Sequence, residues 1–305
     1  MAYRLESDDR SLEAALRRIA GEQFERAMNS IDRDEQSEAV HEVRRHCKRL
    51  RGLIRLVRTG FAEFEAEDMA IRDIAKPLSG LRDARVMLDT FDRLLDDCED
   101  KSVRQHLAKV RKQLDDERRD LLDEVDAGEL LGKARKMLAE ARKRSARWAL
   151  GGDGWEVAGQ GVAITYEKAR ATAAEAFAGR QAVVFHDLRK HIRYHWCHTR
   201  LLRGFWPEEM EARAALADEL AEILGEQHDV WVFVERLDEH PHRFGSGKQV
   251  DKLLALASQR NATLEATAES LTGRLLAETT EALSEHWRAL WSNWREGELP
   301  LSPLP

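Results

Sequence analysis

The sequence predicts an all-helical protein built from two related helical bundles, and three observations support this prediction. Apolar residues recur at spacings of three and four along nearly the whole chain, which is the period of an amphipathic helix, and strand-like alternation is scarce. Only six prolines and eighteen glycines interrupt the 305 residues, which favours long helices. The second half of the chain also repeats a pattern found in the first half.

Helix boundaries follow from proline and glycine signals between the periodic segments. Pro77 and Pro207 stand where helices are expected to begin, because proline lacks the N–H that a helix interior uses. The stretch GGDGWEVAGQG at 151–161 contains five glycines, so it predicts a linker between an N-terminal bundle at 1–150 and a C-terminal bundle at 162–305. The expected helices are 8–30, 36–58, 62–76, 77–97, 100–125, 128–148, 158–178, 181–204, 208–240, 248–275 and 278–295.

Composition narrows the class of protein. Hydrophobic residues make up 43% of the chain and charged residues 34%, with a formal net charge of -7, which is typical of a folded, soluble protein. The N-terminus has no secretory or transit signal, and no apolar run is long enough to span a membrane. Cys47, Cys98 and Cys197 are few and widely spaced, which favours reduced thiols in a cytoplasmic protein over a disulfide framework.

One segment carries a positive charge that contrasts with the acidic chain. Residues 40–58, VHEVRRHCKRLRGLIRLVR, contain seven Lys or Arg and one acid, Glu42, and residues 43–61 contain no acid. At about 100° per residue the cations fall on one helix face and the apolar residues on the opposite face. We call this cationic face the first stripe: His41, Arg44, Arg45, Lys48, Arg51 and Arg55.

The same pattern returns 145 residues later, where HDLRKHIRYHWCHTRLLR at 186–203 aligns with HEVRRHCKRLRGLIRLVR at 41–58. LSGLRDARV at 78–86 also aligns with LGEQHDVWV at 224–232, at a shift of 146, so that Arg82 corresponds to His228. The repeat therefore predicts two copies of one helical unit. We call the cationic face of the second copy the second stripe: His186, Arg189, Lys190, Arg193 and Arg200.

The two stripes indicate an extended anionic ligand. A solvated helix face usually mixes acids with bases, whereas the first stripe cannot neutralise itself, although acids from neighbouring helices could do so. His41 and Arg55 are separated by about 21 Å of helix, which is more than a single phosphate needs. Arginine forks and lysine ammonium groups bind phosphate oxygens, and few aromatic residues are available to stack bases. An extended polyanion that repeats its charges along its length fits this pattern.

These residues resemble the CHAD family, whose name stands for conserved histidine alpha-helical domain. The resemblance rests on a His followed by RRxxKRLR, then LxxLRDxxV, duplicated once, and it runs from about Ser7 to about Trp294. It implies two four-helix bundles related by a pseudo-twofold axis and a basic surface that binds polyphosphate without catalysis. We expect no cofactor, and the sequence leaves an association with polyphosphate granules open. It carries the binding role to the residues His41, Arg44, Arg45, Lys48, Arg51, Arg82, Arg85, His186, Arg189, Lys190 and Arg193.

The second copy departs from the family pattern. Tyr194 and Trp196 stand where the family often repeats Arg, and His228 and Trp231 replace the equivalents of Arg82 and Arg85. We therefore expect the second half to make fewer direct phosphate contacts.

Two other functions remain open. The dipeptides His186-Asp187 and His228-Asp229 occur in HD-type phosphohydrolases, which need His and Asp ligands that converge on a metal. A non-specific nucleic-acid binder would also carry basic helices.

Two clusters have more than one interpretation. His191, His195 and His198 share a helix face with a spacing that can hold zinc, although His195 falls toward the apolar side and fits a hydrogen-bonded core residue better. A basic run on the last helix of the first half either ends a solvated helix or extends the binding surface; its members are Arg135, Lys136, Arg142, Lys143, Arg144 and Arg147.

Overall fold

The computed structural model describes residues 3–96, 126–244 and 247–296, together with residues 104, 107, 108, 110–116 and 119. The side chains of 81–85 and of 296 lie outside this description. Helices account for most of the described residues, and no strand occurs among them. The predicted all-α class is therefore confirmed.

The first half contributes five described helices, and their ends agree with local signals. Ser11 caps α1 by accepting a hydrogen bond from the backbone N of Ala14 at 3.0 Å, and Asp126 caps α6 by accepting one from the backbone N of Glu129 at 2.8 Å. α3 and α4 are separated at Pro77, as expected, whereas the predicted helix 100–125 lies mostly outside the described residues. The helices are α1 (Leu12–Arg33), α2 (Gln36–Leu56), α3 (Phe64–Ala75), α4 (Ser79–Asp96) and α6 (Ala127–Ser145).

The second half differs from the prediction at its start. α7 begins at Gly154, so residues 154–161 of the expected linker are helical and only 151–153 remain outside a helix. Glycine disfavours a helix but does not prevent one when the helix packs against neighbours. The helices are α7 (Gly154–Gly179), α8 (Ala182–Leu201), α9 (Pro207–Glu239), a short 3-10 helix (Pro241–Phe244), α10 (Gly247–Leu275) and α11 (Thr280–Glu296).

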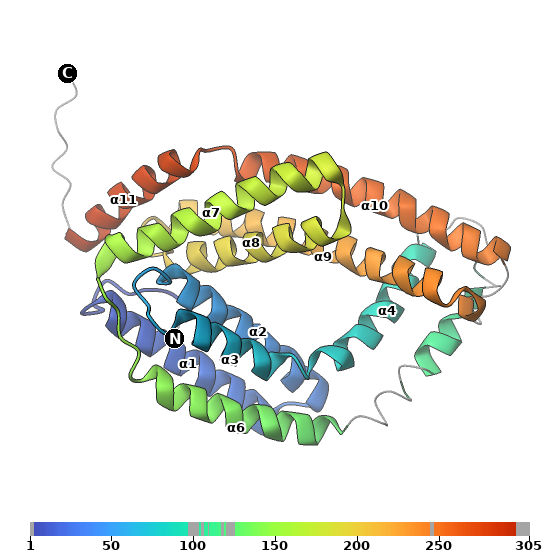
Figure 1. Ribbon diagram of the computed structural model, residues 1–305, viewed down its shortest axis with the longest axis horizontal. Coiled ribbons are helices and arrows are strands. Elements are labelled where there is room, and N and C mark those ends of the chain that lie inside the picture. Colours follow the sequence, from blue (N-terminus) through green and yellow to red (C-terminus); the bar gives the residue numbers. More distant parts are fainter. Residues whose placement is uncertain are drawn as a thin grey trace.

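The halves are joined through a shared core. α1, α2, α3 and α6 pack together as one layer, and α7 to α11 form the other (Figure 1). α2 also packs on α7 and α8, and the largest core cluster contains residues of both halves, from Leu12 and Leu50 to Leu201 and Trp287. The chain segment at Tyr3 and Leu5 strengthens this junction, because Tyr3 Oη donates to Arg49 O and Leu5 N donates to Leu201 O.

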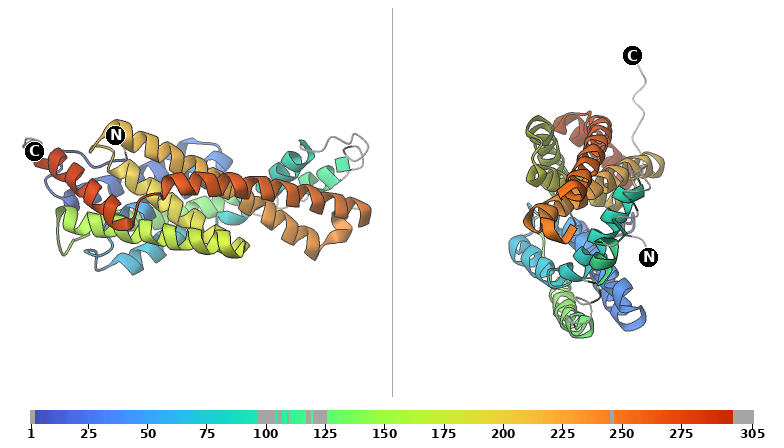
Figure 2. Two further views of the ribbon diagram at one scale, coloured as in Figure 1. Left: turned by 90° about the horizontal axis from the view of Figure 1, so that it is seen from above. Right: turned by 90° about the vertical axis from the view of Figure 1, so that its right-hand side faces the viewer.

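α4 leaves the first layer and packs on α9 and α10 (Figure 1). A second core forms there, with Phe91 of α4 against Phe233 of α9 and Phe233 against Phe244, at ring-centroid distances of 6.1 and 5.7 Å. Figure 2 shows α4 beside α9 and α10 toward the end of the molecule opposite α11. Only α1, α2, α3 and α6 of the described first-half helices therefore form its bundle.

α2 and α8 meet at positions that the repeat makes equivalent. A Cβ atom added to Gly52 would lie 2.5 Å from Cys197, and Gly52 and Cys197 are aligned at the shift of 145. Arg55 lies over the ring of Tyr194 at 4.1 Å, and the aligned counterparts of these two residues, Arg200 and Arg49, also interact electrostatically. A pseudo-twofold axis through this contact predicts such pairs, although the twofold relation itself stays a prediction.

Candidate polyanion-binding surface

The N-terminal part of the first stripe faces solvent. His41, Arg45 and Lys48 are exposed on α2. Arg45 is hydrogen-bonded to Glu42, three residues earlier on the same helix. Arg44 is half-buried and donates to Ala75 O at 3.1 Å and Ser79 Oγ at 2.6 Å, so it links α2 to the junction of α3 and α4.

The C-terminal part of the first stripe is held by an acid from α3. Arg51 donates to Asp68 from Nε at 2.8 Å, and Arg55 donates from its Nη2 atom at 2.8 Å as well as from Nη1. Burial would raise the pKa of Asp68, but the hydrogen bonds from Arg55 and Arg51 outweigh burial and lower that pKa to about 2. Arg51, Arg55 and Asp68 therefore form a half-buried clamp between α2 and α3, and Arg55 extends it to Tyr194 of α8.

The second stripe has a comparable exposed part. Lys190 is exposed and donates to Asp187 at 2.8 Å, again three residues earlier on the same helix. The guanidinium group of Arg189 lies against Gly225 of α9, at the position that corresponds to Ser79 beside Arg44. Each half thus directs the equivalent arginine to the equivalent place on the neighbouring helix.

The remaining cations of the second stripe have acidic partners on α9. Arg193 is hydrogen-bonded to Asp218, and Arg200 donates to Glu211 at 3.1 Å. Neutralisation by neighbouring helices, which the sequence left open, is thus confirmed for these two cations and for the clamp.

His186 is half-buried, and the centroid of its ring lies 4.4 Å from the ring centroid of His228. The repeat places the dipeptides His186-Asp187 and His228-Asp229 at positions that are not equivalent, so the sequence did not predict this contact. Burial lowers the pKa of His186 to about 4, and the nearby Lys190, His228 and Arg189 add to that effect. His186 therefore lies in a positive environment at the edge of the second stripe.

The side chains of Arg82 and Arg85 lie outside the described residues, so their role in binding stays a prediction.

Two further histidines of α8, His195 and His198, lie in the core. His195 is fully buried, accepts a hydrogen bond from Arg213 Nε at 3.0 Å and stacks on Trp287, so the core interpretation is confirmed for it. His198 is also fully buried, and burial lowers its pKa to about 3. Within the described ranges, no group of three or more His, Cys, Asp or Glu is arranged to hold a metal.

The basic run of α6 lies on a separate helix, and acids accompany most of it. Its ion pairs are Arg135 with Asp32, Arg142 with Glu25, Lys143 with Glu140 and Arg144 with Glu67. Lys136 and Arg147 are exposed. This run therefore behaves mainly as a solvated, ion-paired helix face.

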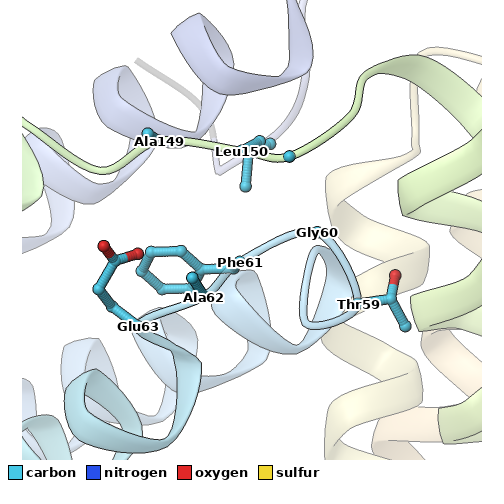
Figure 3. A pocket seen from close by; sticks show the side chains of 8 residues that line it. Thr59, Gly60, Phe61, Ala62, Glu63, Ala149 and Leu150 are labelled. Carbon is cyan, nitrogen blue, oxygen red and sulfur yellow. The ribbon is translucent and has the colours of Figure 1, made fainter.

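Two pockets of the described surface lie away from both stripes. The pocket in Figure 3 has a volume of about 470 Å³ and lies between the 59–63 turn and residues 149–151, with Phe61 on one wall and Leu150 on the other. Another, of about 450 Å³, lies between α1 and α6. No stripe residue lines either pocket, and Arg45, Lys48 and Lys190 are exposed on the helix surface, which suits a polymer better than an enclosed small molecule.

The exposed side chains of His41, Arg45 and Lys48 on α2 and of Lys190 on α8 thus lie on helices that the repeat makes equivalent. A family model, the CHAD domain, matches residues 10–238. The chain belongs to the CHAD-domain family. The match covers α1 to the last turn of α9, so both stripes of this CHAD domain lie inside it and α10 and α11 lie beyond it. A search of curated proteins gave no match. Among the described residues, no helix is long and apolar enough to cross a membrane.

Proposed function

We propose that this CHAD domain binds inorganic polyphosphate, without catalysis, along the exposed parts of the two stripes. The family match supports the proposal, since CHAD domains are associated with polyphosphate binding. The observation that carries it is the equivalent placement of Arg45 on α2 and Lys190 on α8, both exposed, on helices that pack together at Gly52 and Cys197. The proposed setting is the cytoplasm, with polyphosphate granules as one place of action.

The proposal divides the stripe residues into two groups. The pair Lys190–Asp187 is exposed on both sides and contributes about 0–1 kcal/mol, and in the pair Arg45–Glu42 the cation is exposed, so a phosphate chain can reach both cations. The clamp of Arg51 and Arg55 on Asp68 is half-buried and bidentate, and breaking it would cost several times more. We therefore assign direct contact to the exposed residues and a positioning role to the clamp.

A twofold relation would also place the two stripes on one side of the molecule. A twofold axis between α2 and α8 would map the surface through which it passes onto itself. Equivalent residues of the two helices would therefore lie on the same side of the molecule. His41, Arg45 and Lys48 would then share a surface with His186, Arg189 and Lys190. A long anion can cross such a surface and gain contacts on both helices, as multivalent binding requires.

Charge reversal tests the proposal. Arg45→Glu with Lys190→Glu is expected to weaken binding of long-chain polyphosphate by about tenfold or more, because charge-assisted hydrogen bonds contribute about 1.5–3 kcal/mol each. Lys136→Glu on α6 with Arg147→Glu just after α6 makes the same change of net charge and is expected to change affinity about twofold at most. Titration calorimetry at physiological salt measures both, and equal losses would mean that bulk charge alone attracts the ligand.

Competition separates polyphosphate from nucleic acid as the ligand. Long-chain polyphosphate is expected to displace a labelled oligonucleotide, and short oligonucleotides are expected not to displace polyphosphate.

Polyphosphate hydrolysis is a second candidate function, because the contact between His186 and His228 brings together the histidines of both HD dipeptides. Release of orthophosphate from polyphosphate that depends on added Mn²⁺ or Mg²⁺ would replace the binding role with hydrolysis.

A further inference from the structure

Each motif helix carries a single acid within its cationic segment. Between residues 41 and 58 the acid is Glu42, and between residues 186 and 203 it is Asp187. The two acids are equivalent at the shift of 145, and so are the cations that they bind, Arg45 and Lys190. The same acid–base pair thus occurs at the same place on both helices.

Glu42 lies between two basic groups. It accepts a hydrogen bond from Arg45, and its Oε2 atom lies 3.5 Å from Nε2 of His46, with 13% of its side chain exposed. His46 does not supply a permanent charge, because burial lowers its pKa to about 3 and Arg49 and Arg45 reinforce that effect. Glu42 therefore serves mainly as the counter-ion of Arg45.

Asp187 has the same role on α8 but is more open. It accepts a hydrogen bond from Lys190 Nζ at 2.8 Å, and half of its side chain is exposed. The hydrogen bond from Lys190 lowers the pKa of Asp187, and His186 and His191 also favour its charged form. Asp187 is thus an anion held among the residues that are proposed to meet phosphate.

We propose that Glu42 and Asp187 are internal counter-ions that polyphosphate displaces, and that a single long chain displaces both. This inference rests on the proposed function. Without ligand, the carboxylates reduce the repulsion among the cations of each stripe. With ligand, phosphate oxygens compete for the donors on Arg45 and Lys190, and the displaced carboxylates repel the ligand. Both acids therefore lower affinity and set a threshold that favours polymers with many contacts.

The affinities for short and for long polyphosphate are expected to respond differently when Glu42 and Asp187 are neutralised. Tripolyphosphate is short compared with the stripe, so it engages one helix at a time, and each neutralised acid opens its own helix. A long chain that crosses both helices meets both acids at once, so the gains from two neutralised acids multiply.

The experiment uses Glu42→Gln, Asp187→Asn and the double variant in the full chain, with long-chain polyphosphate and tripolyphosphate as the two ligands. Each single variant is expected to bind long-chain polyphosphate about twofold to fivefold more tightly, and the double variant is expected to gain the product of the two factors. For tripolyphosphate, the double variant is expected to bind more molecules per chain and no more tightly than the better single variant.

The matched control is Glu140→Gln, which neutralises the acid of an exposed pair with Lys143 at the same three-residue spacing on α6. It is expected to leave both affinities unchanged. An equal gain in this control, or no gain in either single variant, would overturn the inference. A double variant that gains only as much as one single variant with long chains would disprove the crossing of both helices. If the unaltered protein binds no polyphosphate, the proposed function itself fails.

Discussion

The two motif helices show how one pattern can be used in two ways. Position by position, α2 buries Leu50 and Leu53 where α8 buries His195 and His198. On the opposite face, Arg51 of α2 corresponds to Trp196 of α8. The helices keep equivalent cations toward both ends and differ at 50–53 and 195–198, around the contact of Gly52 with Cys197.

The acidic partners differ in the same way. Asp68 holds Arg51 and Arg55 in a half-buried clamp, whereas Glu211 meets Arg200 on the surface, with half of its own side chain exposed. A cation can thus be part of a basic motif and still serve the fold. The comparison teaches that exposure and partner, rather than the sign of the charge, decide which motif residues are available to a ligand.

The largest expected difference between the helices comes from removal of these acids. Asp68→Ala leaves two half-buried guanidinium groups without a carboxylate, so the free energy of unfolding is expected to fall by about 3 kcal/mol at pH 7. Glu211→Ala removes a surface partner and is expected to cost less than about 1 kcal/mol. Urea unfolding measures both, and equal costs would show that the clamp is no stronger than a surface pair.

The clamp also has a pH signature. Because the pKa of Asp68 is lowered to about 2 in the folded protein, its contribution is fully present above the unfolded value of about 3.9 and is lost as pH falls toward 2. The difference between the unaltered protein and Asp68→Ala is therefore expected to shrink over that range. A constant difference down to pH 2 would assign the effect to packing.

The contact between the helices gives the next largest effect. Gly52→Ala would place a Cβ atom 2.5 Å from the Cβ and Sγ atoms of Cys197, so it is expected to cost about 2 kcal/mol. Adding Cys197→Gly is expected to relieve the clash, with a coupling energy of about 1 kcal/mol in a double-mutant cycle. Gly21→Ala on α1 is the control, because nothing lies within 4 Å of the added atom, and it is expected to stabilise the helix. Additive effects of the first two changes would contradict the contact.

The buried histidines of α8 give the smallest effect. The folded pKa of His198 is about 3 and that of an unfolded histidine is about 6.5, so the unfolded chain takes up a proton first and stability falls as pH drops below 6.5. His198→Leu restores the residue type found at Leu53 and is expected to reduce this fall by about 1.4 kcal/mol per pH unit. Urea unfolding at pH 6 and pH 5 measures it. The same slope in His198→Leu would mean that other groups cause the acid sensitivity.

Local pattern was sufficient for the helices and for both stripes. The periodicity of apolar residues is a property of each segment, so α2 and α8 could be located within a few residues, and the repeat supplied the correspondence between Arg45 and Lys190. The start of α7 was missed because glycine signals a break locally, whereas packing on α2 maintains the helix.

The sequence alone determined that the protein is helical, that two segments repeat and that each carries a row of cations, because these features depend on residues a few positions apart. Only the tertiary structure decided that α4 packs on α9 and α10, that Asp68 reaches Arg51 and Arg55, and that His186 meets His228. Those contacts join residues from different helices. Their distances depend on the angles at which whole helices pack, and no local spacing records those angles.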